Sequence, residues 1–502
     1  MKIEQELTTV AKGAGITFGG KTAGLGIKYL TEVVLARLLG TELFGLYAIG
    51  IVIYKLGEVF SGMGLQSGTV RYVSIYRSSR DRGRLLGVLQ QSIGLPFFGG
   101  LILGSILFLT SGFIAQEVFN KPNLAPVLRI FAVAIPFGAS MTVGALATSG
   151  FQTTKYLVYI RNFFHPITNL ILIVFVGSLG WSLWGAAVAW VLASILGLIL
   201  AVYFILKIFP EERWKKIKPV FETKRLLQFS LPLALGDFLG FILLWMDTLM
   251  LGYFRSASEV GIYRAASQTA LLLMIFLNSL NTIFSPLIAE LFHRNHLQRM
   301  EQLFKVATRW SFSLTLPLFL FVWLAGQDIL RVFGSEFSVG WLPLVVLSIG
   351  QLVNAGTGGI GYMLIMSGHQ YLKLLSDVVL VSLNIVLNIL LIPRWGLLGA
   401  AVATAISIAG VNIIRGVQVY IILKVQAYTW SYFKPLGAGI ITAITGLLVR
   451  HWFSSVHFFI SLIVMGGIVI LSYSILLWGM GLEESDKMIL KKLKKKLGFK
   501  RI

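Results

Sequence analysis

The sequence predicts an all-α polytopic membrane protein with about 14 transmembrane helices. Three features support this fold class. The chain of 502 residues is 56% hydrophobic and only 13% charged, whereas soluble domains carry about 25% charged residues. Its mean hydropathy is +0.81. Apolar runs of about 20 residues recur along the whole chain, and a helix of that length crosses the hydrocarbon core of a bilayer.

Short polar or charged segments separate these runs, so each run is expected to form one crossing helix. We expect helices at residues 13–38, 42–68, 85–111, 124–149, 155–179, 183–207, 226–252, 260–287, 310–333, 341–367, 371–393, 397–424, 434–451 and 457–480.

The distribution of basic residues predicts the orientation in the membrane. Lys and Arg gather in the loops 71–84, 207–225 and 290–309 and in the tail, whereas the opposite loops are short and nearly uncharged. Cytoplasmic loops are rich in Lys and Arg, so we expect a multi-pass protein of the cell (plasma or inner) membrane with both termini in the cytoplasm. The same rule explains the net charge of +22. We therefore expect no nucleic-acid partner, and expect the tail to contact membrane lipids.

Several chemistries are excluded by what the sequence lacks. There is no cysteine, so thiol catalysis, disulfides and cysteine-based metal sites are unavailable. No Walker motif, zinc signature or catalytic constellation occurs, and the outer loops are too short for a catalytic domain. The first residues lack the layout of a signal peptide, so the N-terminus is expected to be retained. We expect a protein that is not an enzyme and has no cofactor.

Short motifs recur in the same order in two halves of the chain. The pairs are FGLY 44–47 with VGIY 260–263, LP 95–96 with LP 316–317, SGFQ 149–152 with SGHQ 367–370, and GAAVA 185–189 with GAAVA 399–403. Their offsets lie near about 216 residues, which indicates a duplication. Six helices per copy predict parallel repeats, an arrangement used by some transporters. We expect an N-terminal lobe at 1–210, a C-terminal lobe at 211–425, two further helices at 426–482 and a basic tail at 483–502.

Four cations lie within the apolar runs, where a bilayer disfavours them. They are Lys21, Lys28, Lys55 and Arg264. A cation at the bilayer centre costs roughly 2.5–3.5 kcal/mol on insertion scales, unless it faces water or an anionic partner. The residues therefore predict a cationic cavity for an anionic ligand, and a diphosphate would suit Lys and Arg together. Carboxylate and sulfate remain alternatives.

Acidic and polar side chains also lie within the predicted helices. The acids Glu32, Glu58, Asp237, Asp247 and Asp377 are expected to line the cavity or to take part in ion coupling. Lys55 and Glu58, three residues apart, share a helix face and could form an ion pair. The oxygen-bearing groups Asp237, Asn384, Asn388 and Thr404 suit a small cation, but helix–helix hydrogen bonds explain the last three equally well. His165 and His369 are expected at the membrane interface.

The segments LGTELFGLY 39–47 and IPRWGLLGAA 392–401 resemble two elements of the polysaccharide flippases, which belong to the multidrug/oligosaccharidyl-lipid/polysaccharide exporter superfamily. The resemblance covers nearly the whole chain. It implies translocation of a polyprenyl-diphosphate-linked oligosaccharide, with Lys21, Lys28, Lys55 and Arg264 as the diphosphate-binding residues. It also implies a sodium site at Asp237, Asn384, Asn388 and Thr404, and therefore coupling to Na⁺ or H⁺. Asn388 departs from the acid expected at its position.

Two alternatives remain open. One is a cation-coupled multidrug exporter of the same superfamily, which the acids Glu32, Glu58, Asp237 and Asp247 would suit. The other is a non-transporting membrane scaffold that works with glycan-assembly enzymes, although cations inside the bundle are hard to explain in a scaffold.

Overall fold

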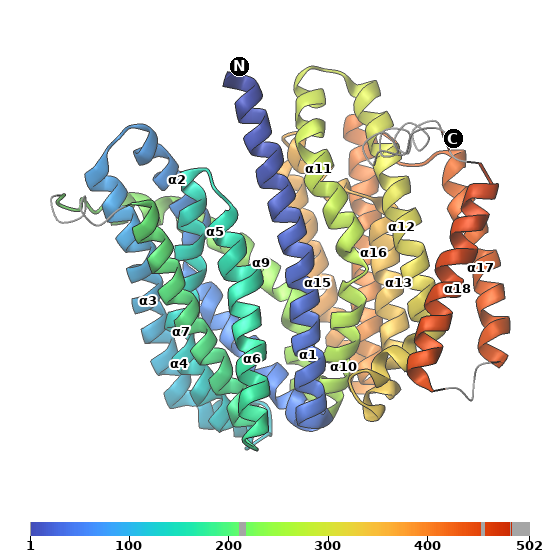
Figure 1. Ribbon diagram of the computed structural model, residues 1–502, viewed down its shortest axis with the longest axis horizontal. Coiled ribbons are helices and arrows are strands. Elements are labelled where there is room, and N and C mark those ends of the chain that lie inside the picture. Colours follow the sequence, from blue (N-terminus) through green and yellow to red (C-terminus); the bar gives the residue numbers. More distant parts are fainter. Residues whose placement is uncertain (1, 210–216, 453–456, 482, 484–502) are drawn as a thin grey trace, which may run out of the picture. The chain divides into compact units, whose positions relative to one another are not determined.

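The computed structural model describes residues 2–209, 217–452, 457–481 and 483 (Figure 1). Within these ranges the chain is almost entirely helical and contains no strand. It forms two compact units: unit 1 comprises Met1–Ala265 and Asn388–Leu397, and unit 2 comprises Ala266–Leu387 and Leu398–Ile502. The helices α10 and α15 each begin in one unit and end in the other.

Unit 1 contains most of the first half of the chain. Its elements are α1 (Lys2–Gly62), α2 (Leu65–Ser78), α3 (Arg82–Phe113), η1 (Ile114–Val118), α4 (Leu124–Ala147), η2 (Thr148–Phe151), α5 (Lys155–Val158), η3 (Tyr159–Phe164), α6 (His165–Ser178), α7 (Leu183–Ile208), α9 (Thr223–Phe254) and most of α10 (Ala257–Leu271).

Unit 2 contains most of the second half. Its elements are α11 (Met274–His293), α12 (Leu297–Arg331), η4 (Ser335–Gly340), α13 (Trp341–Thr357), α14 (Ile360–Met366), most of α15 (Gln370–Trp395), α16 (Leu397–Leu423), η5 (Trp430–Tyr432), α17 (Phe433–Trp452) and α18 (Phe458–Gly479).

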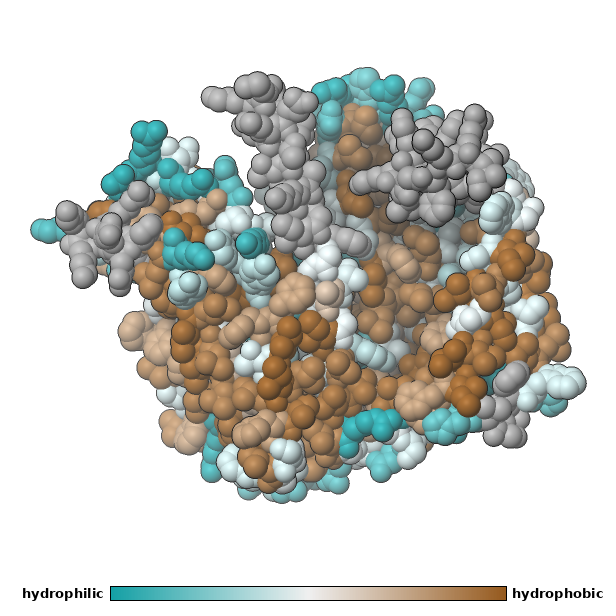
Figure 2. All heavy atoms as spheres, viewed as in Figure 1, coloured by the Kyte–Doolittle hydropathy of each residue, from teal (hydrophilic) through white to brown (hydrophobic). Residues whose placement is uncertain are grey.

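The predicted class, an all-α polytopic membrane protein, is confirmed. Within the described residues 13 helical segments are long and apolar enough to cross a membrane. The first of them, Gly19–Ser78, contains a break at Gly40, where φ is 68° and ψ is 178°. Glycine adopts this conformation without a steric penalty, so two expected crossings meet there, in agreement with the predicted number. On the face shown in Figure 2, apolar side chains cover much of the helices and hydrophilic ones gather near their ends.

Three details differ from the expected helices. The predicted basic loop 71–84 is largely helical, because α2 continues to Ser78. The expected helix 260–287 is divided into α10 and α11, and 341–367 into α13 and α14. The second division lies at Gly358, whose φ of 69° is outside the helical region.

The duplicated FGLY and VGIY motifs meet inside unit 1. A Cβ atom at Gly45 would collide with the backbone oxygen of Ala257, and one at Gly261 would collide with that of Thr41. The hydroxyl of Ser258 donates to that of Thr41 at 2.8 Å. Equivalent residues of the two repeats therefore make one close helix crossing, at the end of unit 1 that carries the Gly40 turn.

The two compact units divide the chain differently from the predicted lobes. The helix α9 and most of α10 belong to unit 1, because α9 packs against α1 and α2. The predicted boundaries at 210 and 425 describe the extent of the repeats, and they remain a prediction. Apart from Glu483, the predicted basic tail lies outside the described residues.

The pair α17–α18, which lies outside the repeats, is fastened to α12 within unit 2. The helix α12 is irregular at Ala325, and Arg450 of α17 donates to the neighbouring carbonyl of Leu324 at 2.5 Å. Ser461 of α18 donates to Asp328 at 2.7 Å. These contacts satisfy polar groups that lipid could not.

Candidate functional site

Two predicted phosphate-binding lysines lie on α1. The side chains of Lys21 and Lys28 are exposed, and neither has a hydrogen-bond or ion-pair partner within the described part of the chain. Between them, Gly24 packs so closely against η3 that a Cβ atom there would collide with Asn162. This close packing brings η3 beside the lysines.

The third lysine, Lys55, lies in the second half of α1 and forms the predicted ion pair. Its Nζ atom is 2.5 Å from Oε2 of Glu58, and the hydroxyl of Thr142 donates to Oε1 of Glu58 at 2.6 Å. The ammonium also lies 5.2 Å from the ring centroid of Tyr54 and 5.4 Å from that of Trp190. Because carboxylate and aromatic faces both attract the cation, Lys55 is compensated.

One cation of this region was not predicted as a site residue. Arg161 of η3 interacts electrostatically with Lys28 and with Glu58. It makes no hydrogen bond or ion pair with another described residue. Because Glu58 is paired with Lys55, no described carboxylate forms an ion pair with Lys28 or Arg161. The three lysines were predicted because each is a charged residue inside an apolar run. Arg161 meets the same criterion and could have been predicted in the same way.

The interpretation of His165 as an interfacial residue was wrong. Its side chain is buried and forms an edge-to-face contact with Trp190 at a centroid distance of 4.9 Å. Its Nε2 atom lies 3.4 Å from the hydroxyl of Ser194. The helix α6 continues directly from α5 and η3, and this continuous helical segment carries His165 into the interior of unit 1.

The fourth predicted cation, Arg264 of α10, is held by the predicted acid Glu32 of α1. Two guanidinium nitrogens of Arg264 lie 3.2 Å and 2.5 Å from the carboxylate oxygens of Glu32. The guanidinium carbon lies 4.5 Å from the ring centroid of Trp245. This bidentate geometry favours a strong ion pair, so Arg264 is compensated as well.

The two acids of α9 have different surroundings. Asp247 accepts hydrogen bonds from Tyr263 at 2.8 Å and from Asn388 at 2.7 Å. Asp237 is half-buried and has no hydrogen-bond or ion-pair partner among the described residues. Of the predicted sodium ligands in unit 1, Asn388 therefore contacts Asp247 and not Asp237.

The other two predicted sodium ligands lie in unit 2 and touch each other. Asn384 of α15 donates to the hydroxyl of Thr404 of α16 at 3.2 Å. This contact is the helix–helix hydrogen bond that was the alternative explanation. Within the residues that can be described, no group of three or more His, Cys, Asp and Glu side chains suits a metal ion. The sodium site remains a prediction.

Asp377 is part of an ion triad in unit 2. One of its oxygens binds Lys373 and the other binds Arg415. The Asp377 side chain is buried, and Arg415 is nearly so. The sequence interpretation missed both cations, although Arg415 also lies inside an apolar run.

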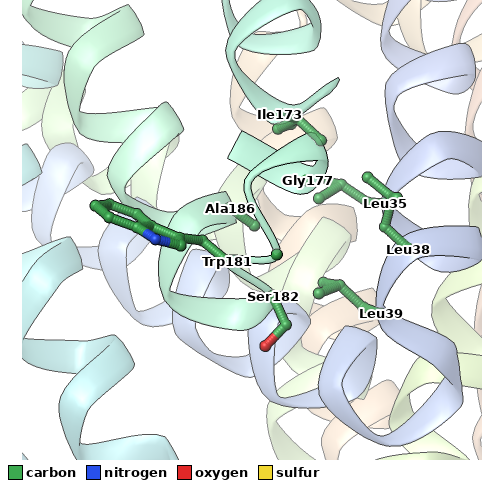
Figure 3. A pocket seen from close by; sticks show the side chains of 9 residues that line it. Leu35, Leu38, Leu39, Ile173, Gly177, Trp181, Ser182 and Ala186 are labelled. Atoms are coloured by element: carbon green, nitrogen blue, oxygen red, sulfur yellow. The ribbon is translucent and has the colours of Figure 1, made fainter. Parts of the chain in front are cut away.

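A small apolar pocket lies at the Gly40 end of unit 1, away from the cations (Figure 3). Its volume is about 150 Å³, and its lining includes Leu35 and Leu39 of α1 with Ile173 and Gly177 of α6. Trp181 and Ser182 close one side of it. Such a lining suits hydrocarbon and not phosphate, so this pocket is separate from the cationic region.

Comparisons with known proteins agree with this arrangement. The pattern of the family described as polysaccharide biosynthesis protein matches residues 10–292, and that of the MatE family matches residues 232–390. The structure resembles lipid II flippase MurJ in an inward closed conformation, with a TM-score of 0.74 and 16% identity over 92% of this chain and 98% of that one. It also resembles a multidrug resistance MATE family transporter, with a TM-score of 0.64 and 16% identity over 79% of this chain and 94% of that one. At these identities the likeness shows the fold.

Curated relatives agree at the level of sequence. The probable low-salt glycan biosynthesis flippase Agl15 of Haloferax volcanii is 30% identical over 38% of this chain and 41% of its own length. The succinoglycan biosynthesis transport protein ExoT of Rhizobium meliloti is 23% identical over 70% of this chain and 68% of its own length. The flippase resemblance is thus confirmed, and because the first family pattern covers more than half of the sequence, the chain belongs to the polysaccharide biosynthesis protein family.

Proposed function

We propose that this protein is a flippase that moves a polyprenyl-diphosphate-linked oligosaccharide from the cytoplasmic to the outer leaflet by alternating access. One observation carries the proposal: Lys28 and Arg161 lie in one electrostatic neighbourhood, and neither has a partner among the described residues. Uncompensated cations in a bilayer require an anion or water. A diphosphate would supply one negative charge or more to each.

The four predicted cations take different parts in this proposal. Lys28, joined by Arg161, contacts the phosphates directly, and Lys21 attracts the headgroup from the cytoplasmic end of α1. Lys55 and Arg264 bind phosphate when the phosphate replaces their carboxylate partners, Glu58 and Glu32 respectively. The acids thus keep these two cations in place while the site is empty.

The orientation favours outward movement. With both termini in the cytoplasm of the plasma or inner membrane, a potential negative inside helps an anion leave by about 2.3 kcal/mol per charge per 100 mV. The lipid tail stays among the membrane lipids, and glycan-assembly enzymes supply and use the cargo. No covalent bond changes, so the protein is not an enzyme.

Ion coupling is a further part of the proposal. Of the four predicted residues, Asn384 and Thr404 of unit 2 would bind Na⁺ and Asp237 of unit 1 would bind H⁺, while Asn388 donates to Asp247. The amide nitrogen of Asn384 lies 3.2 Å from the hydroxyl of Thr404, so the amide and hydroxyl groups of this pair are neighbours, and their oxygens support the Na⁺ variant. The absence of a partner for Asp237 among the described residues supports the H⁺ variant, because a lone half-buried carboxylate exchanges protons readily.

The second candidate is a multidrug exporter. The MatE pattern over residues 232–390 includes Asp237, which would attract a cationic drug. The excess of cations at Lys28 and Arg161 opposes this assignment, because it repels such a drug.

The first test is flipping of a fluorescent polyprenyl-diphosphate oligosaccharide in vesicles that contain the purified chain. Lys28→Ala and Arg161→Ala should each slow flipping about tenfold or more, because a charge-assisted contact to phosphate is lost. Arg129→Ala is the matched control, since Arg129 lies in α4 and donates to Ser111 at 3.1 Å. Equal rates for all three variants would contradict the cationic site.

A second test concerns alternating access. Thr41 and Ser258 hold the two repeats together at the Gly40 end, and their hydroxyls are 2.8 Å apart. In this cysteine-free chain, the pair Thr41→Cys and Ser258→Cys should form a single disulfide under oxidation. It should abolish flipping, and a reductant should restore it. Flipping that continues with the disulfide formed would show that this crossing does not open.

A further inference from the structure

A second, polar pocket lies at the Gly40 end of unit 1. Its volume is about 590 Å³, and the segment after η1, the segment between α9 and α10, and Glu42 of α1 surround it. Pockets for small molecules typically measure about 300–1,000 Å³. Its lining does not include Lys21, Lys28, Lys55 or Arg161, so it is separate from the cationic region.

Two cations, Lys121 and Arg255, tie the walls of the pocket together through hydrogen bonds to backbone carbonyls. The ammonium of Lys121 donates to the carbonyls of Phe119, Gly252 and Arg255 at 3.0, 2.7 and 2.9 Å. These bonds tie the segment after η1 to the end of α9. Burial of this ammonium also lowers the pKa of Lys121.

Arg255 fastens the other side in the same manner. Its guanidinium donates to the carbonyls of Ile392 at 3.1 Å and of Pro393 at 2.8 Å, at the end of α15. Helix C-termini attract cations in this manner. Backbone carbonyls therefore take N–H donors of both cations, which leaves fewer donors to grip an anion in the pocket.

The acids of the pocket have no such partners. Glu42 and Glu259 each directly follow a member of the hydrogen-bonded pair Thr41 and Ser258. Neither carboxylate has a hydrogen-bond or ion-pair partner within the ranges that the structure describes. Both line the pocket, so four carboxylate oxygens are available as acceptors.

Amides and rings complete the lining. The side chains of Asn120 and Asn123 are exposed at the pocket and make no hydrogen bond with another described residue, and each amide offers both a donor and an acceptor. Tyr253, with 57% of its surface exposed, and Phe254 lie on the same rim. Paired hydrogen-bonding groups beside aromatic faces suit a ring that has hydroxyl groups on its edge and C–H groups on its face.

We infer that this pocket binds a neutral or cationic carbohydrate, namely one or two sugar units presented at the outer surface. Sugar hydroxyls donate to Glu42 and Glu259 and exchange hydrogen bonds with Asn120 and Asn123, while Tyr253 covers the apolar face of the ring. Phosphate and acidic sugars are disfavoured, because the two carboxylates repel them and backbone carbonyls already take N–H donors of Lys121 and Arg255. The inference rests on the proposed function, since it assigns a place to the glycan part of the cargo.

The site also has a conformational consequence. Glu42 and Glu259 stand on the two helices that cross at Thr41 and Ser258, so the pocket is complete only while this crossing is closed. A carbohydrate that binds there stabilises the closed crossing, because a ligand favours the state that it binds. Added sugar should therefore raise the yield of the disulfide between Thr41→Cys and Ser258→Cys.

The direct test uses the full chain in biotinylated nanodiscs, clustered on streptavidin so that weak binding becomes detectable. The probe is a glycan array of neutral hexoses, N-acetylhexosamines, amino sugars, deoxysugars and uronic acids. We expect binding to a subset of the neutral or amino sugars and to none of the uronic acids. Glu42→Ala and Glu259→Ala should each weaken that binding about tenfold.

The matched control is Glu117→Ala, an exposed acid of η1 that does not line the pocket, and it should bind as the unchanged chain does. No binding to any glycan would overturn the inference, and so would binding that persists in both pocket variants or that requires added calcium. Flipping by Lys28→Ala reports on the proposed function independently. If Lys28→Ala loses flipping as expected but the unchanged chain binds no glycan on the array, the carbohydrate pocket is rejected and the proposed function stands.

Discussion

Unit 1 and unit 2 each hold several charges inside membrane-spanning helices, but they compensate them differently. In unit 2, Asp377 binds both Lys373 and Arg415. In unit 1, Glu58 binds Lys55, while Lys28 and Arg161 have no partner among the described residues. The number of cations therefore does not identify a ligand site. A ligand site is identified by cations that form no ion pair within the described chain, and two such cations, Lys28 and Arg161, lie in unit 1.

The largest effect should come from removing the shared acid of unit 2. Asp377→Ala leaves two cations without a counter-charge, and breaking a buried ion pair from one side costs about 3–5 kcal/mol. Thermal unfolding in detergent, followed by the fluorescence of the 12 tryptophans, would measure this loss.

A matched variant distinguishes the effect of leaving the two cations unpaired from the effect of removing the whole triad. The triple replacement Asp377→Leu, Lys373→Met and Arg415→Met removes the whole triad, and it should be far less destabilising than Asp377→Ala, because apolar side chains need no counter-charge. If the single variant unfolds no earlier than the triple one, the triad is not a structural ion network.

A smaller effect is expected in unit 1 when Lys55 is replaced. Lys55→Met leaves Glu58 with Thr142 as its described hydrogen-bond donor, so the free energy of unfolding should fall by about 1–3 kcal/mol. The double variant Lys28→Ala and Arg161→Ala should instead stay within about 0.5 kcal/mol of the unchanged chain, because it removes two charges that form no ion pair or hydrogen bond with a described residue. The same unfolding assay measures both. A large loss of stability in the double variant would mean that these cations are structural.

The same contrast explains what the sequence could predict. Hydropathy predicted the membrane fold, because each crossing is a local run of apolar residues. The pair Lys55–Glu58 was also predictable, because i,i+3 spacing places both groups on one helix face. The pair Arg264–Glu32 joins residues 232 positions apart, and such contacts depend on how helices pack. For this reason the sequence could place Arg264 inside the bundle but could not show that Glu32 neutralises it.

The errors have related causes. Arg161 and Arg415 are also charges in apolar runs, but the family resemblance implied other residues, Lys21, Lys28, Lys55 and Arg264, as the binding cations. His165 follows η3, and its distance from the membrane surface depends on η3 and α6 forming one continuous helix. Asp377 was interpreted as a coupling acid because its partner Arg415 lies 38 positions away.

An ion network outside the membrane-spanning segments shows how charges are paired where water is present. Glu222, just before α9, accepts a hydrogen bond from Tyr76, and its oxygens lie 3.0 Å from Arg84 and 3.4 Å from Arg225. The hydrogen bond from Tyr76, and then the charges of Arg84 and Arg225, lower the pKa of Glu222 below its ordinary value. The ionised form is thus favoured by folding, so this group stabilises the fold above its unfolded pKa, and the contribution is lost as the pH falls through the lower folded pKa.

This exposed network should give the smallest effect of the three, because water screens its charges. Glu222→Gln should lower the unfolding midpoint slightly at pH 7, and the difference from the unchanged chain should shrink as the pH falls below about 4.3, the ordinary pKa of a glutamate. Glu290→Gln is the control, since Glu290 pairs only with the exposed Arg294 of the next turn among its described neighbours, and it should not change the midpoint. Measurement of the unfolding midpoint from pH 7 to pH 3.5 tests this expectation. A Glu222→Gln difference that stays constant over that range would mean that the side chain acts through packing and hydrogen bonds that do not depend on its charge.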